Sequence, residues 1–222
     1  MPASTPTAPS TASSSLKADT PLRIGCVIMA SGLGRRFGGN KLMADFGGEP
    51  MIAQILRATD GLFDRRIVVT RSNDVAAYCR NRGIDVLLHE LPLRSDTVRL
   101  GLSAMLDTDG CLFTPADQPL LKRETICALI RCFHEDSASI WRPAYHGEPG
   151  SPVLFPCWAY DELRALPDGK GGGYVAARYP DRVRTLPVFD PHELMDADTP
   201  EEFARLLSIH LNATRKDDSH EL

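Results

Sequence analysis

No apolar run in this chain is long enough to cross a bilayer, although hydrophobic residues make up 43% of its 222 positions. The chain also lacks an excess of positive charge: its formal net charge is -4, which argues against general binding of nucleic acids. None of its six cysteines belongs to a C-x-x-C pair, so we expect buried reduced thiols rather than a structural zinc site. These absences predict a cytoplasmic protein that binds neither membranes nor nucleic acids, with a size that suits one globular domain.

Large apolar side chains are almost absent from residues 1–20, which are mostly Ser, Thr, Pro and Ala. Such a segment cannot bury enough surface to order itself. It has neither the apolar core of a signal peptide nor the arginines of a transit peptide. We therefore expect a disordered tail over 1–20, a folded domain over 21–212 and a polar tail over 213–222.

Short apolar segments alternate with amphipathic ones in the first half of the chain. The pattern predicts strands at 24–29, 66–70, 84–88 and 110–114, and helices at 50–62, 73–81 (capped by Asn73), 95–106 and 122–134. Strands joined by crossover helices form a parallel sheet covered on both faces. The second half is less regular, with strands predicted at 139–142, 152–155 and 183–188, and helices at 158–166, 174–179 and 199–211.

A glycine-rich loop follows the first predicted strand and is the most informative feature of the sequence. Residues 32–41 hold four glycines, two arginines and a lysine. Glycines let backbone N–H groups approach an anion, and Arg and Lys supply charge that a phosphate accepts. The loop is not a Walker A loop, because Lys41 is followed by Leu42, and it lacks the dinucleotide fingerprint spacing. We interpret it as a loop for nucleotide phosphates; the alternative is a glycine-rich turn with solvated charges.

A second loop, Pro115–Pro119, follows the fourth predicted strand and holds Asp117 between two prolines. Because ligands of parallel sheets lie outside the carboxyl ends of the strands, both loops are expected to line one cleft. Mg²⁺ is commonly held by one or two carboxylates together with phosphate oxygens and waters. The sequence therefore favours Asp117 as a Mg²⁺ ligand, and the alternative is a turn aspartate that bonds to its own loop.

A third segment, Met195–Glu202, begins the last predicted helix. Thr199 and Glu202 have the spacing of a capping box, with Pro200 at the first helical position. This capping explains neither Asp196 nor Asp198, and two alternating acids at this point can supply a second metal ligand.

In order along the chain, five segments resemble motifs of the molybdenum cofactor cytidylyltransferases, the MocA-like branch of the MobA-like NTP transferases. They are Met29–Leu42, Asp117–Pro119, Gly150–Phe155, Gly169–Gly172 and Asp196–Pro200. The resemblance implies a three-layer α/β/α Rossmann-like nucleotidyltransferase fold with a mostly parallel sheet. It also implies transfer of CMP from CTP to molybdenum-molybdopterin, which gives molybdopterin cytosine dinucleotide and pyrophosphate. That product serves molybdenum hydroxylases, so an apo molybdenum hydroxylase is the expected client.

The resemblance, taken together with the charges on the loops, assigns roles to single residues. Arg36, Lys41 and Asp117 are expected to be catalytic, the first two by offsetting phosphate charge. Asp117 and Asp198 are expected to hold Mg²⁺, and Ser151 and Lys170 to lie on the acceptor side. The residues expected around the nucleotide are Ala30, Ser31, Gly32, Leu33, Gly34, Gly38, Lys41, Ser95, Thr97, Pro115 and Asp117.

Among the positions that depart from the family pattern, three leave alternatives open. Leu93 stands where a glycine is frequent near the base, Gly173 where a basic residue is common, and Ser151 where His or Asn is frequent. One alternative is a guanylyltransferase, or a sugar- or alcohol-phosphate nucleotidyltransferase, of the same fold; the Ala30–Gly32 segment resembles the cytidylyl branch more closely. The other is a non-catalytic cofactor carrier, which does not need a metal-bridged triphosphate.

Overall fold

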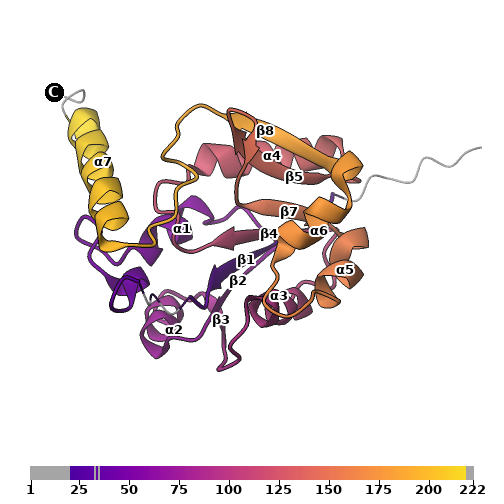
Figure 1. The fold of residues 1–222 in the computed structure, drawn as a ribbon, viewed down its shortest axis with the longest axis horizontal. Coiled ribbons are helices and arrows are strands. Elements are labelled where there is room, and N and C mark those ends of the chain that lie inside the picture. The colour runs from indigo at the N-terminus through magenta and orange to yellow at the C-terminus, as the bar shows by residue number, and fades with distance from the viewer. Residues whose placement is uncertain (1–20, 33, 35, 219–222) are drawn as a thin grey trace, which may run out of the picture.

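The alternating apolar segments form one mixed sheet between two layers of helices in the computed structural model, which describes residues 21–32, 34 and 36–218 (Figure 1). The strands are β1 (Ile24–Ala30), β2 (Arg65–Thr70), β3 (Asp85–Leu88), β4 (Gly110–Pro115), β5 (Ile140–Tyr145), β6 (Glu148–Pro149), β7 (Val153–Pro156) and β8 (Val183–Val188). The helices are α1 (Ile52–Ala58), α2 (Asn73–Arg80), α3 (Arg94–Ser103), α4 (Arg123–Glu135), α5 (Tyr160–Arg164), α6 (Gly172–Arg178) and α7 (Pro200–Asp218), with short 3-10 turns at Lys41–Met43, Cys157–Ala159 and Pro180–Arg182.

The strand order is β3-β2-β1-β4-β7-β5-β6, and β8 pairs with β5. Strand β1 lies in the parallel part of the sheet, where Val27 is paired with Ile67 of β2 and Phe113 of β4. Strand β7 runs antiparallel to β4, so the direction of the sheet changes between these two strands. This architecture confirms the predicted three-layer, mostly parallel fold and brings the ends of β1, β2 and β4 to one edge.

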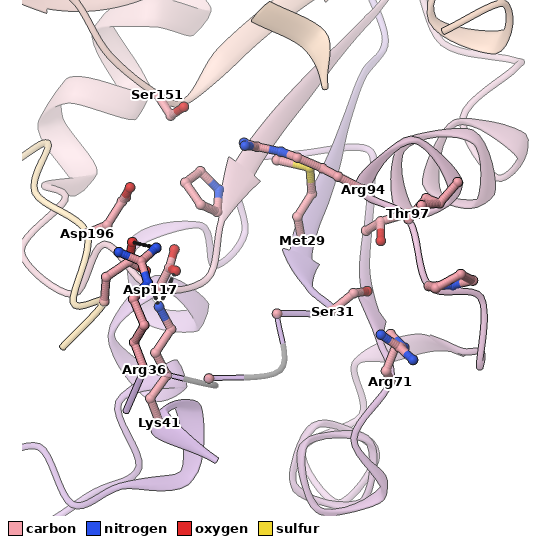
Figure 2. Close-up of a pocket in the computed structure, with 16 residues that line it drawn as sticks. Met29, Ser31, Arg36, Lys41, Arg71, Arg94, Thr97, Asp117, Ser151 and Asp196 are labelled. Carbon is pink, nitrogen blue, oxygen red and sulfur yellow. Dashed lines mark hydrogen bonds and ion pairs between the residues drawn. The ribbon is translucent and has the colours of Figure 1, made fainter. Parts of the chain in front are cut away.

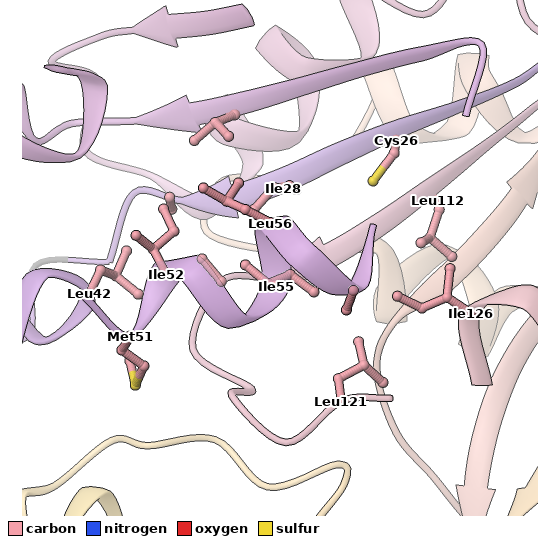
Figure 3. Close-up of a cluster of buried hydrophobic side chains, with 14 of the residues drawn as sticks. Cys26, Ile28, Leu42, Met51, Ile52, Ile55, Leu56, Leu112, Leu121 and Ile126 are labelled. Carbon is pink, nitrogen blue, oxygen red and sulfur yellow. The ribbon is translucent and has the colours of Figure 1, made fainter. Parts of the chain in front are cut away.

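Two apolar clusters hold the three layers together. On one face, Cys26 and Ile28 of β1 belong to a cluster with residues of α1 and α4, among them Ile55 and Ile126 (Figure 3). On the other face, Val27 belongs to a cluster formed with residues of α3, α5 and α6. Strand β1 is therefore buried on both sides, as a central strand of a parallel sheet should be.

Helix α3 lies unusually close to β1 because a glycine faces the strand. A Cβ built on Gly101 would stand 2.4 Å from a methyl carbon of Val27, well inside van der Waals contact. The backbone of α3 therefore rests directly on the side chain of the central strand. This contact sets the distance between α3 and β1, and the first residues of α3 line the cleft described below.

Several element boundaries differ from the prediction. Helix α2 is capped by Ser72, whose side chain accepts a hydrogen bond from the Val75 N–H, rather than by Asn73. Helix α7 continues to Asp218, so the helix includes part of the predicted polar tail 213–222. The short strand β6 was not predicted. The tail at 1–20 and residues 219–222 lie outside the described residues.

The cysteines agree only in part with the expectation of buried thiols. All six are free; Cys26, Cys79 and Cys111 are buried, whereas Cys157 is exposed. Among the residues that the structure describes, no helix is both long and apolar enough to cross a membrane.

Candidate active site

A cleft of about 610 Å³ opens at the edge of the sheet where β1, β2 and β4 end. Its lining comes from both predicted loops and from four further segments, so the predicted single cleft is confirmed. Figure 2 shows the side chains gathered at two ends, with Lys41 and Asp117 at one and Ser31 and Arg71 at the other. The lining residues are Met29, Ser31, Gly32, Gly34, Arg36, Lys41, Arg71, Pro92, Leu93, Arg94, Thr97, Pro115, Asp117, Ser151, Asp196 and Asp198.

The glycine-rich loop curls back on itself because Gly34 adopts a left-handed conformation, with φ of +56°. Its carbonyl oxygen accepts hydrogen bonds from the N–H groups of Phe37 and Gly38 at 2.9 and 3.1 Å. A Cβ at Gly34 would stand 2.3 Å from the carbonyl oxygen of Gly39, so any larger residue would force the backbone apart. The loop is also tied to the end of β2, where the Asn40 amide donates to Ser72 Oγ at 2.9 Å.

Lys41 is a buried lysine at the end of this loop, with only 7% of its side chain exposed. Its Nζ donates to Asp117 Oδ2 at 2.6 Å and to Asp198 Oδ1 at 2.8 Å. Burial alone lowers the pKa of an ammonium, but the two carboxylates outweigh burial and raise the pKa of Lys41. The ammonium therefore stays charged between two carboxylates that come from distant parts of the chain.

Arg36 adds a second cation at this end of the cleft. Its guanidinium donates to Asp198 Oδ2 at 3.1 Å, and the arginine side chain is 74% exposed. The hydrogen bond from Lys41 holds the pKa of Asp198 below its usual range. Because Arg36 is solvated, its ion pair is weak and the guanidinium can move to another anion.

The acidic segment is held against the second loop by the backbone. The Ala197 N–H donates to the Asp117 carbonyl at 2.9 Å, which places Asp196 and Asp198 beside Asp117. The predicted capping box is present, since Glu202 accepts from the Thr199 N–H at 2.9 Å and donates its own N–H to Thr199 Oγ1. Asp196 is open to solvent on one side, yet surrounding protein atoms and the Asp117 charge raise its pKa to about 6.

The opposite end of the cleft is polar but has no carboxylate among its lining residues. Ser31 Oγ donates to the Val69 carbonyl at 3.2 Å and lies 2.8 Å from His89 Nε2. Because the hydroxyl proton is donated to the Val69 carbonyl, the Ser31 oxygen accepts a hydrogen bond from the His89 imidazole. Burial lowers the pKa of His89, so the ring is neutral at pH 7. Arg71 donates to the Glu90 carbonyl at 3.3 Å, and its buried Nε has no partner.

The cleft carboxylates can hold a hard divalent cation such as Mg²⁺ only if oxygen atoms of the substrate complete the ion's ligand shell. Within residues 21–32, 34 and 36–218, no three His, Cys, Asp or Glu side chains are arranged to hold a metal ion together. The carboxylates of Asp117 and Asp198 already converge on one cation, the Lys41 ammonium. Mg²⁺ commonly takes one or two carboxylates and completes its shell with phosphate oxygens and waters. The two aspartates fit this pattern.

The structure brings most predicted site residues to the cleft. Four of them do not line it: Ala30, Gly38, Ser95 and Lys170. Ser95 is fully buried, and its Oγ accepts from the Gly169 N–H at 3.2 Å, so it holds two segments together instead. Leu33 lies outside the described residues.

Two arginines that line the cleft were missed by sequence reasoning. Arg71 directly follows β2, and Arg94 begins α3. The position of Arg71 is a usable signal, because residues that follow a parallel strand face the same edge as the glycine-rich loop. Arg94 has no comparable sequence signal, since an arginine at a helix start reads as a surface charge.

The model of the MobA-like NTP transferase domain family matches residues 26–183, a range that includes both cleft-forming loops. The chain belongs to this family. A "Probable molybdenum cofactor guanylyltransferase" of Natranaerobius thermophilus is 28% identical over 128 residues, covering 56% of this chain and 62% of that protein. A 3-deoxy-manno-octulosonate cytidylyltransferase of Chlorobium phaeovibrioides is 31% identical over 98 residues, covering 42% of this chain and 39% of that protein. The chain thus aligns with less than two thirds of either relative.

Solved structures agree with this family membership at the level of the fold. Rv0371c from Mycobacterium tuberculosis has a TM-score of 0.72 at 24% identity, covering 85% of this chain and 99% of that one. A manganese complex of the same protein has a TM-score of 0.71 at 22% identity, covering 84% and 98%. At these identities the likeness establishes the architecture of the MobA-like fold and leaves the substrates to the site itself.

Proposed function

We propose that this MobA-like chain transfers CMP from CTP to molybdenum-molybdopterin, giving molybdopterin cytosine dinucleotide and pyrophosphate for a molybdenum hydroxylase. The observation that carries the proposal is the buried ammonium of Lys41, held between Asp117 and Asp198 where the glycine-rich loop ends. This arrangement joins a cation, a pair of metal-binding oxygens and a phosphate-sized loop in one cleft. Phosphoryl chemistry needs these parts more than it needs a strong base.

The cleft has room for a nucleoside triphosphate with its base and phosphates at different ends. The end with Ser31 and Thr97 has polar groups and no carboxylate, and it suits an uncharged base and its sugar. The glycine-rich loop and Lys41 suit the triphosphate, because they offer backbone donors and positive charge. Arg36 is exposed, so its guanidinium can turn from Asp198 toward a phosphate.

In the proposed reaction, an oxygen of the acceptor's terminal phosphate attacks the α-phosphorus of CTP. A new P–O bond forms, the bond from the α-phosphorus to the bridging oxygen breaks, and pyrophosphate leaves with the electron pair. The attacking phosphate is largely ionised at neutral pH, since its second pKa is about 6, so no side chain has to remove a proton. Lys41 and Arg36 offset the charge that builds up on the phosphates.

Asp117 and Asp198 would hold Mg²⁺ in this reaction. When bound, the ion would neutralise phosphate oxygens and so lower the cost of bringing two anions together. Asp196 stands beside these ligands and adds a third acid to the same end of the cleft. Support for divalent metal use in this fold comes from the manganese complex of the structural neighbour.

The choice of CTP rests on the Ala30–Gly32 segment, which resembles the cytidylyl branch. The second candidate is the same transfer from GTP, because relatives of this chain carry the name molybdenum cofactor guanylyltransferase. A cytidylyltransferase for a sugar acid is also among the relatives, so the cytidylyl reaction has a named precedent at similar identity.

The experiment that tests the proposal is pyrophosphate release by the purified full-length chain with Mg²⁺ and molybdenum-molybdopterin. CTP, GTP, ATP and UTP are supplied one at a time. Release with CTP alone is the expected result. Release with GTP and not CTP would replace the proposed base with guanine, and no release with any nucleotide would contradict the proposed transfer.

A further inference from the structure

Arg94 differs from the other three cations that line the cleft. Lys41 is engaged by Asp117 and Asp198, Arg36 is paired with Asp198, and Arg71 donates to a backbone carbonyl. The Arg94 side chain forms neither an ion pair nor a hydrogen bond with any residue that the structure describes. Its guanidinium is exposed and reaches across the middle of the cleft, as Figure 2 shows.

The direction of Arg94 is set by packing rather than by a polar partner. A Cβ built on Gly171 would stand 2.8 Å from Arg94 Nε, so the arginine stem lies flat against a glycine. The same stretch of chain is fastened to α3, because Ser95 accepts the Gly169 N–H at 3.2 Å and Arg99 donates to the carbonyls of Arg164 and Leu166. The 164–171 segment and the start of α3 therefore form one support beneath Arg94.

We propose that Arg94 binds the terminal phosphate of the acceptor. The inference rests on the proposed function, in which the acceptor is a phosphate monoester. A phosphate dianion must come close to an already anionic triphosphate, and this requires a cation that no carboxylate in the cleft has claimed. Arg94 meets that need from the wall opposite Asp117, between the two ends of the cleft, and its planar fork suits two phosphate oxygens.

The charges at the two ends of the cleft support this division of labour. The carboxylates that line the cleft, Asp117, Asp196 and Asp198, all belong to the Lys41 end. An acceptor phosphate would be repelled there, because the metal ion and Lys41 are committed to the nucleotide and do not offset the carboxylate charge for a second anion. On the α3 wall Arg94 offers a separate positive charge. The acceptor and the nucleotide then draw on different cations and do not compete.

The test is the effect of Arg94→Gln on the two substrates separately. We expect the KM for molybdenum-molybdopterin to rise about 10- to 100-fold, the range for losing a charged hydrogen-bond donor. The KM for CTP should stay within about twofold, because nucleotide contacts are untouched. Arg94→Lys should recover part of the loss by restoring charge without the fork. A rise in the KM for CTP with no change for the acceptor would overturn the proposal.

Two further variants control for charge and for fold. Arg131→Gln removes an equal charge from an exposed position on α4, away from the cleft, and should leave both KM values unchanged. Gly171→Ala keeps the charge but pushes the guanidinium aside, and its φ is compatible with alanine. It should raise the acceptor KM severalfold while the melting temperature stays close to that of the wild type. An unchanged acceptor KM in Gly171→Ala would count against the packed direction of Arg94.

A second experiment tests the phosphate site at Arg94 even if the proposed CMP transfer is wrong. If the wild type turns over no nucleotide with molybdenum-molybdopterin, inorganic phosphate becomes the probe. Its binding is measured by calorimetry on the full chain saturated with CTP and Mg²⁺, or with whichever nucleotide binds. Binding to the wild type that is lost in Arg94→Gln would uphold the phosphate site while the acceptor is revised. Equal binding to both proteins would overturn the site.

Discussion

The Lys41 ammonium and the Asp117 carboxylate are 2.6 Å apart, although 76 residues separate them in the chain. The pair joins the loop after β1 to the loop after β4, two strands that lie side by side in the sheet. Asp198 enters the same contact from the segment before α7. One lysine thus connects the three motifs that the sequence places far apart, and its removal should disturb all of them.

Replacing Lys41 by methionine should lower kcat/KM for CTP by about 10²- to 10³-fold, the range for losing one preorganised group that stabilises developing charge. Methionine keeps most of the buried stem while it removes the ammonium that lies between two carboxylates. The measurement is steady-state pyrophosphate release at fixed Mg²⁺. A change of less than threefold would show that Lys41 has only a structural role.

Asp117→Ala should abolish turnover and leave the fold intact, because Asp117 is only partly buried and Lys41 keeps Asp198 as a partner. Pyrophosphate release reports the first effect, and circular dichroism with a melting curve reports the second. Asp161→Ala, which removes a 90% exposed carboxylate from α5, is the matched control and should behave like the wild type. Unchanged release in Asp117→Ala would remove this residue from the mechanism.

Asp196 should make folding stability depend on pH in a direction opposite to that of an ordinary paired aspartate. Its pKa is raised from 3.8 to about 6, so the folded state holds the proton more tightly than the unfolded chain. The stability linked to that proton is present below pH 3.8 and is lost as pH rises through 6. The side chain of Asp196→Asn cannot titrate. The difference in melting temperature, variant minus wild type, should therefore increase between pH 4 and pH 7. A constant difference across this range would contradict the raised pKa.

Ser31→Ala should weaken both the fold and the nucleotide end of the cleft. The substitution leaves His89 without the 2.8 Å partner of its Nε2, and its buried Nδ1 already has none. We expect a loss of about 1 kcal/mol in unfolding free energy and a KM for nucleotide about fivefold higher. Ser103→Ala removes a hydroxyl that bonds within an exposed turn of α3 and serves as the control. Equal effects of the two substitutions would deny Ser31 any special role.

The parts of the site that local chemistry defines were predictable. The glycine-rich loop and Asp117 each sit at the end of a short apolar strand, so strand pattern and loop composition place both at one edge. The capping box of Thr199 and Glu202 is likewise a local pattern, and the structure contains it. What these features share is that neighbours in sequence determine them.

Features that depend on packing between distant segments were not predictable. Arg94 points into the cleft only because Gly171, 77 residues away, leaves room for its stem. Ser95 was expected near the nucleotide, yet it is buried and bonded to Gly169, a contact without any sequence pattern. The extension of α7 to Asp218 carries polar residues without an apolar stripe, so periodicity gave no reason to continue the helix.

The contact between Gly101 and Val27 means that the wall carrying Arg94 cannot slide along the floor of the cleft. At Gly101 no α3 side chain separates the helix backbone from Val27, and closely packed interiors resist small displacements. The glycine-rich loop is packed less tightly at two of its positions, because a Cβ built on Gly38 or Gly39 would meet no atom within 4 Å. A larger side chain at Gly101 would therefore push α3, and the cleft wall that carries Arg94, away from the sheet, whereas one at Gly39 would meet no neighbouring atom.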